Sequence, residues 1–297
     1  MIAQYAADGI VLGATLALGA IGLTLTYNIL RFANFAHGEF LTFGAYFALV
    51  FAALFAGGQT LGPLTFGWGF LEAVAAAVVL TGLLALVLDR LLFRALRRSD
   101  VTVTLVIASF GASLMLRNVV VFVWGSRPEY YSREIAVRSE LLPGVFMSAD
   151  EVFVIGLTAL AMLALALFLS RTRLGRAMRA VSDDPALARV SGIDVQAVIR
   201  WTWLIGGGLA AVAGALFGLT VQISPEMGFN MILPMFAAAI LGGVGSIQGA
   251  VLGGLVIGLA QALSVPLIGA AYKPAVAFAL MFLILLFYPR GILGGRT

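Results

Sequence analysis

The chain of 297 residues has no cysteine, one histidine (His37) and one lysine (Lys273). Without cysteine it can form no disulfide and no thiolate metal site, and it has no thiol nucleophile. A single histidine also excludes a metal site built from several histidines. Because proline follows Lys273, the sequence has no G-x-x-x-x-G-K-[ST] phosphate-binding loop. We therefore expect no catalytic residue, metal or cofactor on this chain, and any ATP that drives it must be hydrolysed by a partner.

Charge is scarce as well, because only 11% of the residues are charged while 62% are hydrophobic. A soluble domain carries about 25% charged residues. The apolar segments are long enough to cross a membrane as helices. We predict an all-α polytopic membrane protein with a single transmembrane domain over residues 1–297 and eight or nine spans, some of them broken or half-length. The spans are expected at about 8–27, 36–56, 72–92, 102–124, 150–170, 201–222, 231–247, 249–268 and 273–288.

The basic residues orient these spans. Thirteen of the 18 fall on one side of the predicted alternation and four on the other, so the positive-inside rule makes the first side cytoplasmic. The N-terminus is then outside and the C-terminus in the cytoplasm, as in a multi-pass protein of the inner (cytoplasmic) membrane. Membrane orientation accounts for the net charge of +4, so we expect lipid and no nucleic acid as a partner. The thirteen are Arg31, Arg90, Arg94, Arg97, Arg98, Arg171, Arg173, Arg176, Arg179, Arg189, Arg200, Arg290 and Arg296, and the four are Arg127, Arg133, Arg138 and Lys273.

The cytoplasmic loop at about 171–200 contains a short helix with both ends marked in the sequence. Asp184 is a good N-cap, Pro185 suits the first helical position, and Gly192 suits the left-handed position after the last turn. About seven residues remain for the helix, or roughly 10 Å at 1.5 Å per residue. The loop at about 125–149, on the other side of the membrane, has mixed charges and is expected to be an ordered cap.

The faces of this short helix indicate a possible docking surface. Leu187 and Val190 are three residues apart and share a face, while Ala186 and Ala188 keep the helix slim. A helix held on a basic loop between spans can bind a cytoplasmic partner. We expect a bulky residue at Ala188 or Gly192 to disrupt such docking.

The segment LRFANFAHGEF, residues 30–40, brings polar groups to the start of the second span. Ionisable groups within a span are costly, so Asn34, His37, Gly38 and Glu39 are candidates for a pathway or gating role. His37 and Glu39 do not share a helical face, so the segment is either irregular or touches several neighbours. In the structural alternative, Glu39 pairs with Arg31 or another arginine at the cytoplasmic end, and His37 caps a helix.

Glycine is abundant, with 35 residues, and breaks are expected in the last third of the chain. Glycines four apart, such as Gly254 and Gly258, let helix backbones approach closely in lipid. The segments that begin at 231 and 249 are either half-helices or one broken element. The candidate residues for this break, or for helix packing, are Gly242, Gly243, Gly245, Ser246 and Gly249.

Arg117 lies inside a predicted span, about seven residues and roughly 10 Å from its outer end. It either extends its side chain to the interface or lines a pathway. Few other charges lie within the spans, whereas ion pathways are usually lined by rings of charged side chains. The substrate is therefore expected to be neutral or zwitterionic.

Three stretches together resemble the permease subunit of branched-chain amino-acid ABC importers. They are GLTLTYNILRFANFAHGEFLTFGAY (Gly22–Tyr46), TRLGRAMRAVSDDPALARVSGIDV (Thr172–Val195) and ILGGVGSIQGAVLGGLVIGLAQ (Ile240–Gln261). The resemblance implies a homologous second permease, or a second copy of this chain. It also implies two cytoplasmic ATPases that bind ATP and magnesium, and an extracytoplasmic substrate-binding protein. Leucine, isoleucine and valine are the usual substrates, although related permeases move urea, short amides or sugars.

The same resemblance gives the short helix a role. Permeases of ABC importers carry a cytoplasmic E-A-A-x-x-x-G loop that docks into a cleft of the ATPase. Here its glutamate and one alanine are replaced, so no ion pair is expected at Ala186. The implied ATPase-coupling residues are Asp184, Pro185, Ala186, Leu187, Ala188, Arg189, Gly192 and Ile193.

We therefore predict a non-catalytic permease subunit that moves branched-chain or similar small amino acids by alternating access, driven by ATP hydrolysis on a partner. A urea or short-amide permease of the same family is one alternative. A proton-coupled secondary transporter that uses Glu39 and His37 is a second. A passive channel is a third.

Overall fold

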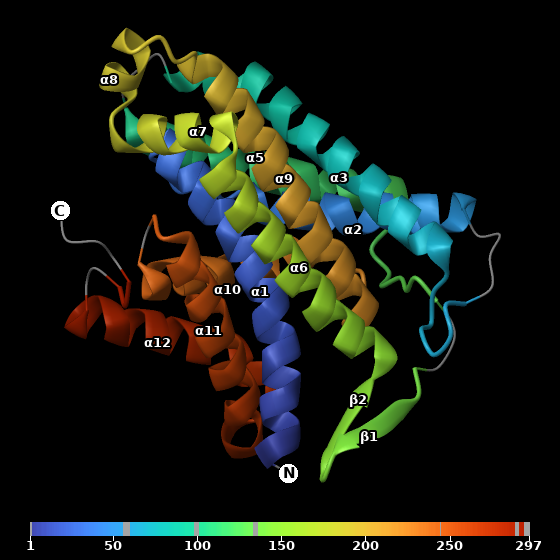
Figure 1. Ribbon diagram of the computed structural model, residues 1–297. Helices are drawn as coiled ribbons and strands as arrows, with labels where there is room; N and C mark the ends of the chain where they lie inside the picture. Colours follow the sequence, from blue (N-terminus) through green and yellow to red (C-terminus); the bar gives the residue numbers. More distant parts are fainter. Residues whose placement is uncertain are drawn as a thin grey trace.

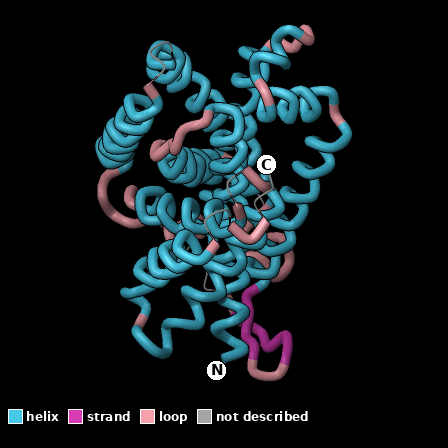
Figure 2. Tube along the Cα trace, turned by 90° about the vertical axis from the view of Figure 1, so that its left-hand side faces the viewer, coloured by secondary structure: helices cyan, strands magenta, loops and turns pink. Residues whose placement is uncertain are grey.

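The computed structural model describes residues 2–55, 60–97, 101–132, 136–243, 245–288 and 291–293, and helices dominate it (Figures 1 and 2). Eight helices in this part of the chain are long and apolar enough to cross a membrane, which confirms the polytopic α-helical prediction. In chain order the elements are α1 (Ile2–Leu30), α2 (His37–Leu54), α3 (Trp68–Leu88), the π-helical η1 (Asp89–Phe93), α4 (Arg94–Leu96), α5 (Thr102–Trp124), β1 (Arg138–Leu142), β2 (Val145–Ser148), α6 (Ala149–Arg171), α7 (Arg173–Asp183), α8 (Pro185–Val190), α9 (Val195–Thr220), α10 (Met227–Gly242), α11 (Ile247–Ile268), the 3₁₀ turn η3 (Ala270–Tyr272) and α12 (Lys273–Phe287).

Helix α1 lies at the centre of the bundle and is buried over most of its length. On one side it packs against α9, which also contacts α2 and α3; on the other it packs against α10 and α11, with α12 outside them (Figure 1). Its closest partner is α11, because small residues let the two backbones meet. A Cβ added at Gly13 would lie only 2.9 Å from the Cα of Leu255. Such contacts between small residues are how helices pack tightly in lipid.

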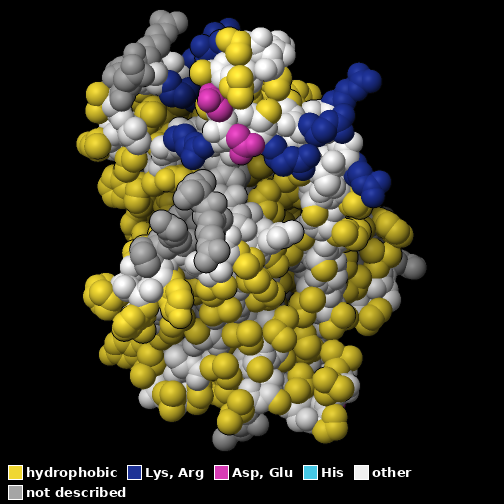
Figure 3. Space-filling model, turned by 60° about the vertical axis from the view of Figure 1, so that its left-hand side comes forward, with side chains coloured by type: hydrophobic (Ala, Val, Ile, Leu, Met, Phe, Trp, Pro, Cys, Tyr) yellow, Lys and Arg dark blue, Asp and Glu magenta, His cyan; other side chains and the backbone are white. Residues whose placement is uncertain are grey.

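The two ends of the bundle differ in structure and in charge. Helices α7 and α8 lie at one end, and the β1–β2 hairpin lies at the other (Figure 1). Figure 3 shows lysine and arginine side chains gathered at the end that carries α7 and α8, above a surface that is largely hydrophobic. Of the basic residues used for orientation, Arg98, Arg133, Arg290 and Arg296 lie outside the described residues. We call this end the arginine-rich end; it is defined by Arg31, Arg90, Arg94, Arg97, Arg171, Arg173, Arg176, Arg179, Arg189 and Arg200.

The hairpin at the opposite end is an element that the span pattern does not predict. Strand β1 pairs antiparallel with β2, and Leu142 lies opposite Val145 across a Pro143–Gly144 turn. Proline followed by glycine is the sequence signal that marks such a turn. Gln4 of α1 both donates to and accepts from the backbone of Phe146, at 3.0 and 2.7 Å. The hairpin therefore packs against the start of α1.

The expected break in the last third of the chain separates two helices, α10 and α11. The predicted span 231–247 is wrong at its end, because α10 stops at Gly242 and α11 begins at Ile247. Gly243 and Gly245 have φ values of 102° and 101°, a left-handed backbone that ends a helix. With 16 residues, α10 is shorter than the eight membrane-length helices.

The chain returns to this break after α12. The backbone N–H of Ile292 donates to the carbonyl oxygen of Leu241 at 2.8 Å, and that of Leu293 donates to Gly242 at 3.0 Å. Residues 291–293 therefore satisfy two carbonyl groups that α10 leaves free at its C-terminal end.

Candidate functional site

The short helix α8 begins at a side-chain cap, as the sequence predicts. The Asp184 Oδ1 atom accepts hydrogen bonds from the backbone N–H groups of Ala186 and Leu187, at 2.8 and 3.0 Å. Pro185 occupies the first turn, where a missing N–H costs nothing. The cap turns the chain sharply from α7 into α8 and fixes where α8 starts.

The C-terminal end of α8 is capped at Gly192. Gly192 has a φ of 85°, and its N–H donates to Arg189 at 3.1 Å, while the N–H of Ile193 donates to Ala188 at 3.0 Å. This pair of bonds is a Schellman motif, which satisfies the last carbonyls of a helix. The predicted N-cap and the left-handed glycine are thus confirmed, and the helix has six residues where about seven were expected.

The exposed surface of α8 includes its two larger apolar side chains. Leu187 is 62% exposed and Val190 is 82% exposed, whereas Ala188 is only 3% exposed and packs into the core. The expectation that a bulky residue at Ala188 disrupts docking stays a prediction, but Ala188 does not lie on the exposed face. A bulky residue there would disturb the packing of α8 on its own chain, and one at Gly192 would strain the positive φ. Leu187 and Val190 are the large apolar side chains of α8 that are exposed to another protein.

Helix α7 connects α8 to the spans. Its N-cap is Thr172, whose Oγ1 accepts from Gly175 N at 2.9 Å, and its buried residues Gly175, Met178 and Val181 recur every three positions. The Arg31 guanidinium, just after the end of α1, donates to the backbone carbonyl of Ser182. Helix α7 is thereby bonded to the arginine-rich end of α1.

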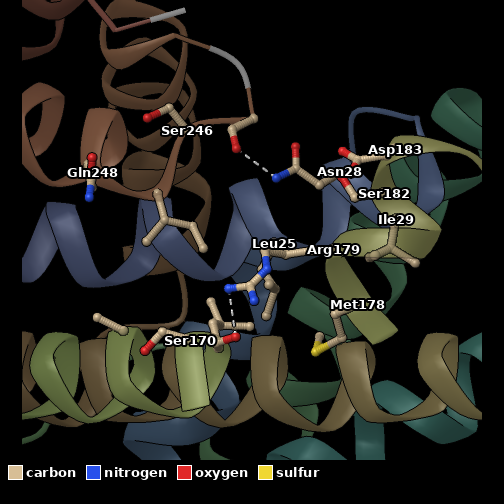
Figure 4. Close-up of a pocket in the computed structure, with 14 residues that line it drawn as sticks. Leu25, Asn28, Ile29, Ser170, Met178, Arg179, Ser182, Asp183, Ser246 and Gln248 are labelled. Atoms are coloured by element: carbon tan, nitrogen blue, oxygen red, sulfur yellow. Dashed lines mark hydrogen bonds between the residues drawn. The ribbon is translucent and has the colours of Figure 1, made fainter. Parts of the chain in front are cut away.

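A cavity of about 440 Å³ separates α7 from the turn between α10 and α11 (Figure 4). Asn28 crosses part of this space and donates a 2.8 Å hydrogen bond to the Gly245 carbonyl, while Arg179 donates to the Leu169 carbonyl at 2.8 Å. The cavity is bordered by α1, α6, α7 and the α10–α11 turn, so four elements of the bundle meet at it.

The Asn34–Glu39 segment returns from the end of α1 into the bundle. The Asn34 Oδ1 atom accepts from Ala36 N at 3.1 Å, and Phe35 N donates to Ser109 Oγ at 3.1 Å. The His37 Nε2 atom lies 3.1 Å from the carbonyl oxygen of Gly19, which is eleven positions before the last residue of α1. Helix α2 therefore begins within the bundle and not at its surface.

The structure assigns His37 and Glu39 to different neighbours, as their helical spacing predicts. His37 contacts α1, while the Glu39 Oε1 atom accepts a 3.0 Å hydrogen bond from Ser113 Oγ of α5. The structural alternative is wrong for both residues. Among the described residues, Glu39 has Ser113 as its hydrogen-bond partner and not an arginine of the arginine-rich end, and the His37 side chain does not cap α2.

Several polar atoms of this segment have no partner within the described residues. They are Asn34 Nδ2, His37 Nδ1 and Glu39 Oε2, all on side chains that are buried. An unsatisfied buried polar group costs about 1–3 kcal/mol, so its presence calls for a water or a functional reason. Gly38 lies between them and meets α10, because a Cβ at Gly38 would overlap the backbone of Gly228.

The glycine-rich candidates at the α10–α11 break act in packing and capping. Side chains at Gly242 or Gly249 would overlap the opposite backbone, so the two helices touch at these positions. Ser246 caps α11 by accepting from Gly249 N at 3.0 Å, and Gly245 accepts from Asn28. Sequence reasoning missed Asn28, because its partner lies 217 positions away.

Comparison with known proteins matches the chain to one family of permeases over nearly its whole length. The family model described as "Branched-chain amino acid transport system / permease component" matches residues 5–285. The permease protein LivH of Escherichia coli K12 is 40% identical over 298 residues, covering 98% of this chain and 95% of the relative. The permease protein BraD of Pseudomonas aeruginosa is 38% identical with the same coverage, and a probable LivH of Methanocaldococcus jannaschii is 32% identical over 94% of this chain. No solved structure matches the chain.

Proposed function

The chain belongs to the branched-chain amino-acid permease family, and from this premise we propose that it is the membrane-spanning subunit of an ATP-driven importer of leucine, isoleucine and valine. Matches to branched-chain amino-acid permeases over nearly the whole length support this substrate class over urea or short amides. ATP and magnesium belong on two cytoplasmic ATPase partners, since the sequence has no phosphate-binding loop. A second permease, or a second copy, and an extracytoplasmic binding protein complete the assembly.

In this proposal the arginine-rich end is cytoplasmic. Its many arginines beside apolar spans support the assignment by the positive-inside rule. The N-terminus and the β1–β2 hairpin then lie outside, the hairpin on the side from which a binding protein delivers substrate.

Helix α8 is the ATPase-docking element. The observation that carries this role is the exposure of Leu187 and Val190 on a capped helix at the arginine-rich end. Two apolar side chains on one face suit a groove in a partner, as in other helix-in-groove contacts. The caps at Asp184 and Gly192 hold that face in one orientation and lower the entropy lost on docking.

Motion passes from α8 to the spans through α7. Closure of the ATPase pair would move α8, and α7 carries that displacement to α1 through Arg31 and the Ser182 carbonyl. The cavity beside α7 leaves room for the movement, because a close-packed interior would resist it. Alternating access then needs two arrangements of the spans that the ATPases favour in turn.

The test is to place a charge on the exposed face of α8. Leu187→Asp and Val190→Asp are expected to reduce co-purification of the ATPase and leucine uptake at least tenfold, without lowering the unfolding temperature of the permease. Leu142→Asp is the matched control, because Leu142 is an exposed leucine on the hairpin at the opposite end. Unchanged ATPase binding by both α8 variants would refute the docking role.

A further inference from the structure

An ion pair joins α5 to the start of α10 at a partly exposed position. The Arg117 guanidinium of α5 binds the Glu226 carboxylate at the N-cap of α10, and it also lies 5.4 Å above the Phe229 ring. The Glu226 side chain is 60% exposed and that of Arg117 is 27% exposed. The sequence suggests that Arg117 either extends to the interface or lines a pathway, and neither alternative includes this ion pair with α10.

The surface around this pair is apolar. Met115, on the same helix, is 61% exposed, and other large apolar side chains of α5 are exposed along its length. These residues suit contact with lipid or with an apolar partner. The further exposed apolar residues of α5 are Val103, Ile107, Phe110, Leu114, Val119, Phe122 and Val123.

The pair lies at membrane depth. Arg117 is seven residues from the C-terminal end of α5, or about 10 Å along the helix. The first turn of α10, beside Glu226, packs on the start of α2, where Gly228 N donates to Thr42 Oγ1 at 3.0 Å. The start of α2 in turn contacts the middle of α1 through His37. Exposed charges at this depth are costly in hydrocarbon and are expected to face a water-filled path.

Two exposed amides extend the polar patch. Asn118 follows Arg117 on α5, and Asn230 lies one helical turn after Glu226 on α10. The Asn118 Nδ2 atom donates to the Leu114 carbonyl at 2.7 Å, so its carbonyl oxygen is directed away from that bond. We call Arg117, Asn118, Glu226 and Asn230 the α5–α10 polar patch.

A second carboxylate lies behind the patch. Glu39 interacts electrostatically with Arg117, and its Oε2 atom has no hydrogen-bond partner within the described part of the chain. Arg117 therefore binds the exposed carboxylate of Glu226 directly and attracts the buried carboxylate of Glu39 without an ion pair among the described residues. Because the Glu226 side chain is 60% exposed, it can also meet an additional cationic group.

We propose that the α5–α10 polar patch is this subunit's substrate-contacting wall, which binds the charged backbone of a zwitterionic amino acid. Arg117 binds the α-carboxylate, for which a guanidinium has matching paired donors. Glu226 binds the α-ammonium, and the two asparagines offer neutral hydrogen bonds to the same groups. The inference rests on the proposed function and adds the site at which the permease holds its substrate.

Water access is the first test, and the natural absence of cysteine makes it direct. Asn230→Cys and Asn118→Cys are introduced singly into the assembled transporter and exposed to a charged, water-soluble methanethiosulfonate. Both cysteines are expected to be labelled, and saturating leucine with the binding protein should slow labelling at least threefold. Leu163→Cys is the control and should remain unlabelled, because Leu163 is an exposed leucine in the middle of another apolar span, α6.

Charge variants are the second test. Glu226→Gln is expected to lower leucine uptake at least tenfold while ATPase co-purification is unchanged. The double variant Arg117→Glu with Glu226→Arg rebuilds an ion pair with reversed signs, so a purely structural pair would recover uptake. Because the reversed charges repel both ends of the substrate, we expect no recovery.

Recovery by the reversed pair, or labelling of Asn230→Cys no faster than Leu163→Cys, would overturn the substrate contact. A failure of the proposed function would give a different result. If the proposed function is wrong, the unmodified complex takes up no leucine, isoleucine or valine. If only the substrate contact is wrong, the unmodified complex takes up these amino acids normally.

Discussion

The side-chain amide of Asn28 donates a hydrogen bond to the backbone carbonyl of Gly245 across 2.8 Å, joining the end of α1 to the turn between α10 and α11. This contact crosses one edge of the cavity beside α7 (Figure 4). It links the central helix to the group formed by α10, α11 and α12 at the arginine-rich end.

Asn28→Ala should therefore destabilise the protein. The Gly245 carbonyl would lose its partner in a partly buried position, at a cost of about 1–2 kcal/mol. Thermal unfolding of the purified chain in detergent measures the effect. Gln248→Ala is the control, because Gln248 borders the same cavity but is exposed, and its unfolding temperature should not change. Equal unfolding temperatures for both variants would contradict the assigned role of Asn28.

Two substitutions at Asp184 test whether the N-cap of α8 supports ATPase binding. Asp184→Asn keeps a side-chain oxygen for the Ala186 and Leu187 N–H groups, whereas Asp184→Ala removes it. Loss of an N-cap costs about 0.5–2 kcal/mol of helix stability. We expect reduced ATPase affinity for the alanine variant and near-normal affinity for the asparagine variant. Equal losses of affinity in the two variants would show that the negative charge matters and the cap does not.

A change from glycine to alanine is expected to destabilise the contact between α1 and α11 at Gly254 but not to destabilise α5 at Gly111, which lies outside that contact. Gly254→Ala places a methyl group against the backbone of Ala17, and overpacking of this kind costs about 1–3 kcal/mol. Gly111→Ala on α5 meets no atom within 4 Å and should stabilise its helix slightly. Unfolding of the two variants in parallel measures the difference, and similar behaviour would rule out the close approach.

The energy source of uptake distinguishes an ATP-driven importer from a proton-driven transporter. In sealed vesicles, uptake should require ATP on the side of α8 and should persist when a proton ionophore dissipates the pH gradient. Glu39→Gln is expected to change uptake by the same factor with and without the gradient, because Glu39 has a serine as its hydrogen-bond partner. Loss of only a gradient-dependent component would instead favour the proton-coupled alternative.

Local signals in the sequence predict much of this fold. The apolar run at 102–124 coincides with α5, because glycine follows it directly and a polar, arginine-rich segment precedes it. Asp184 and Gly192 mark the ends of α8 through bonds that reach no further than five residues along the chain. Span positions, caps and left-handed glycines are all encoded by neighbouring residues, and they can therefore be predicted.

Partners distant in the chain could not be predicted in the same way. Ser113 lies 74 positions from Glu39, and Glu226 lies 109 positions from Arg117. One sequence contains no signal for such pairs, because they depend on how whole helices cross. The burial of Ala188 has the same origin, since spacing alone shows which residues share a face and not which face the bundle covers.

The hydrogen bonds between residues 291–293 and the end of α10 have a consequence for biogenesis. A carbonyl group without a partner is poorly tolerated inside lipid. The ribosome makes Ile292 and Leu293 about fifty residues after Leu241 and Gly242, a delay of roughly 3–10 s at 5–20 residues per second. During that interval the end of α10 must keep contact with water or with the insertion machinery. The end of α10 therefore gains its final hydrogen-bond partners only after the residues that follow α12 have been made.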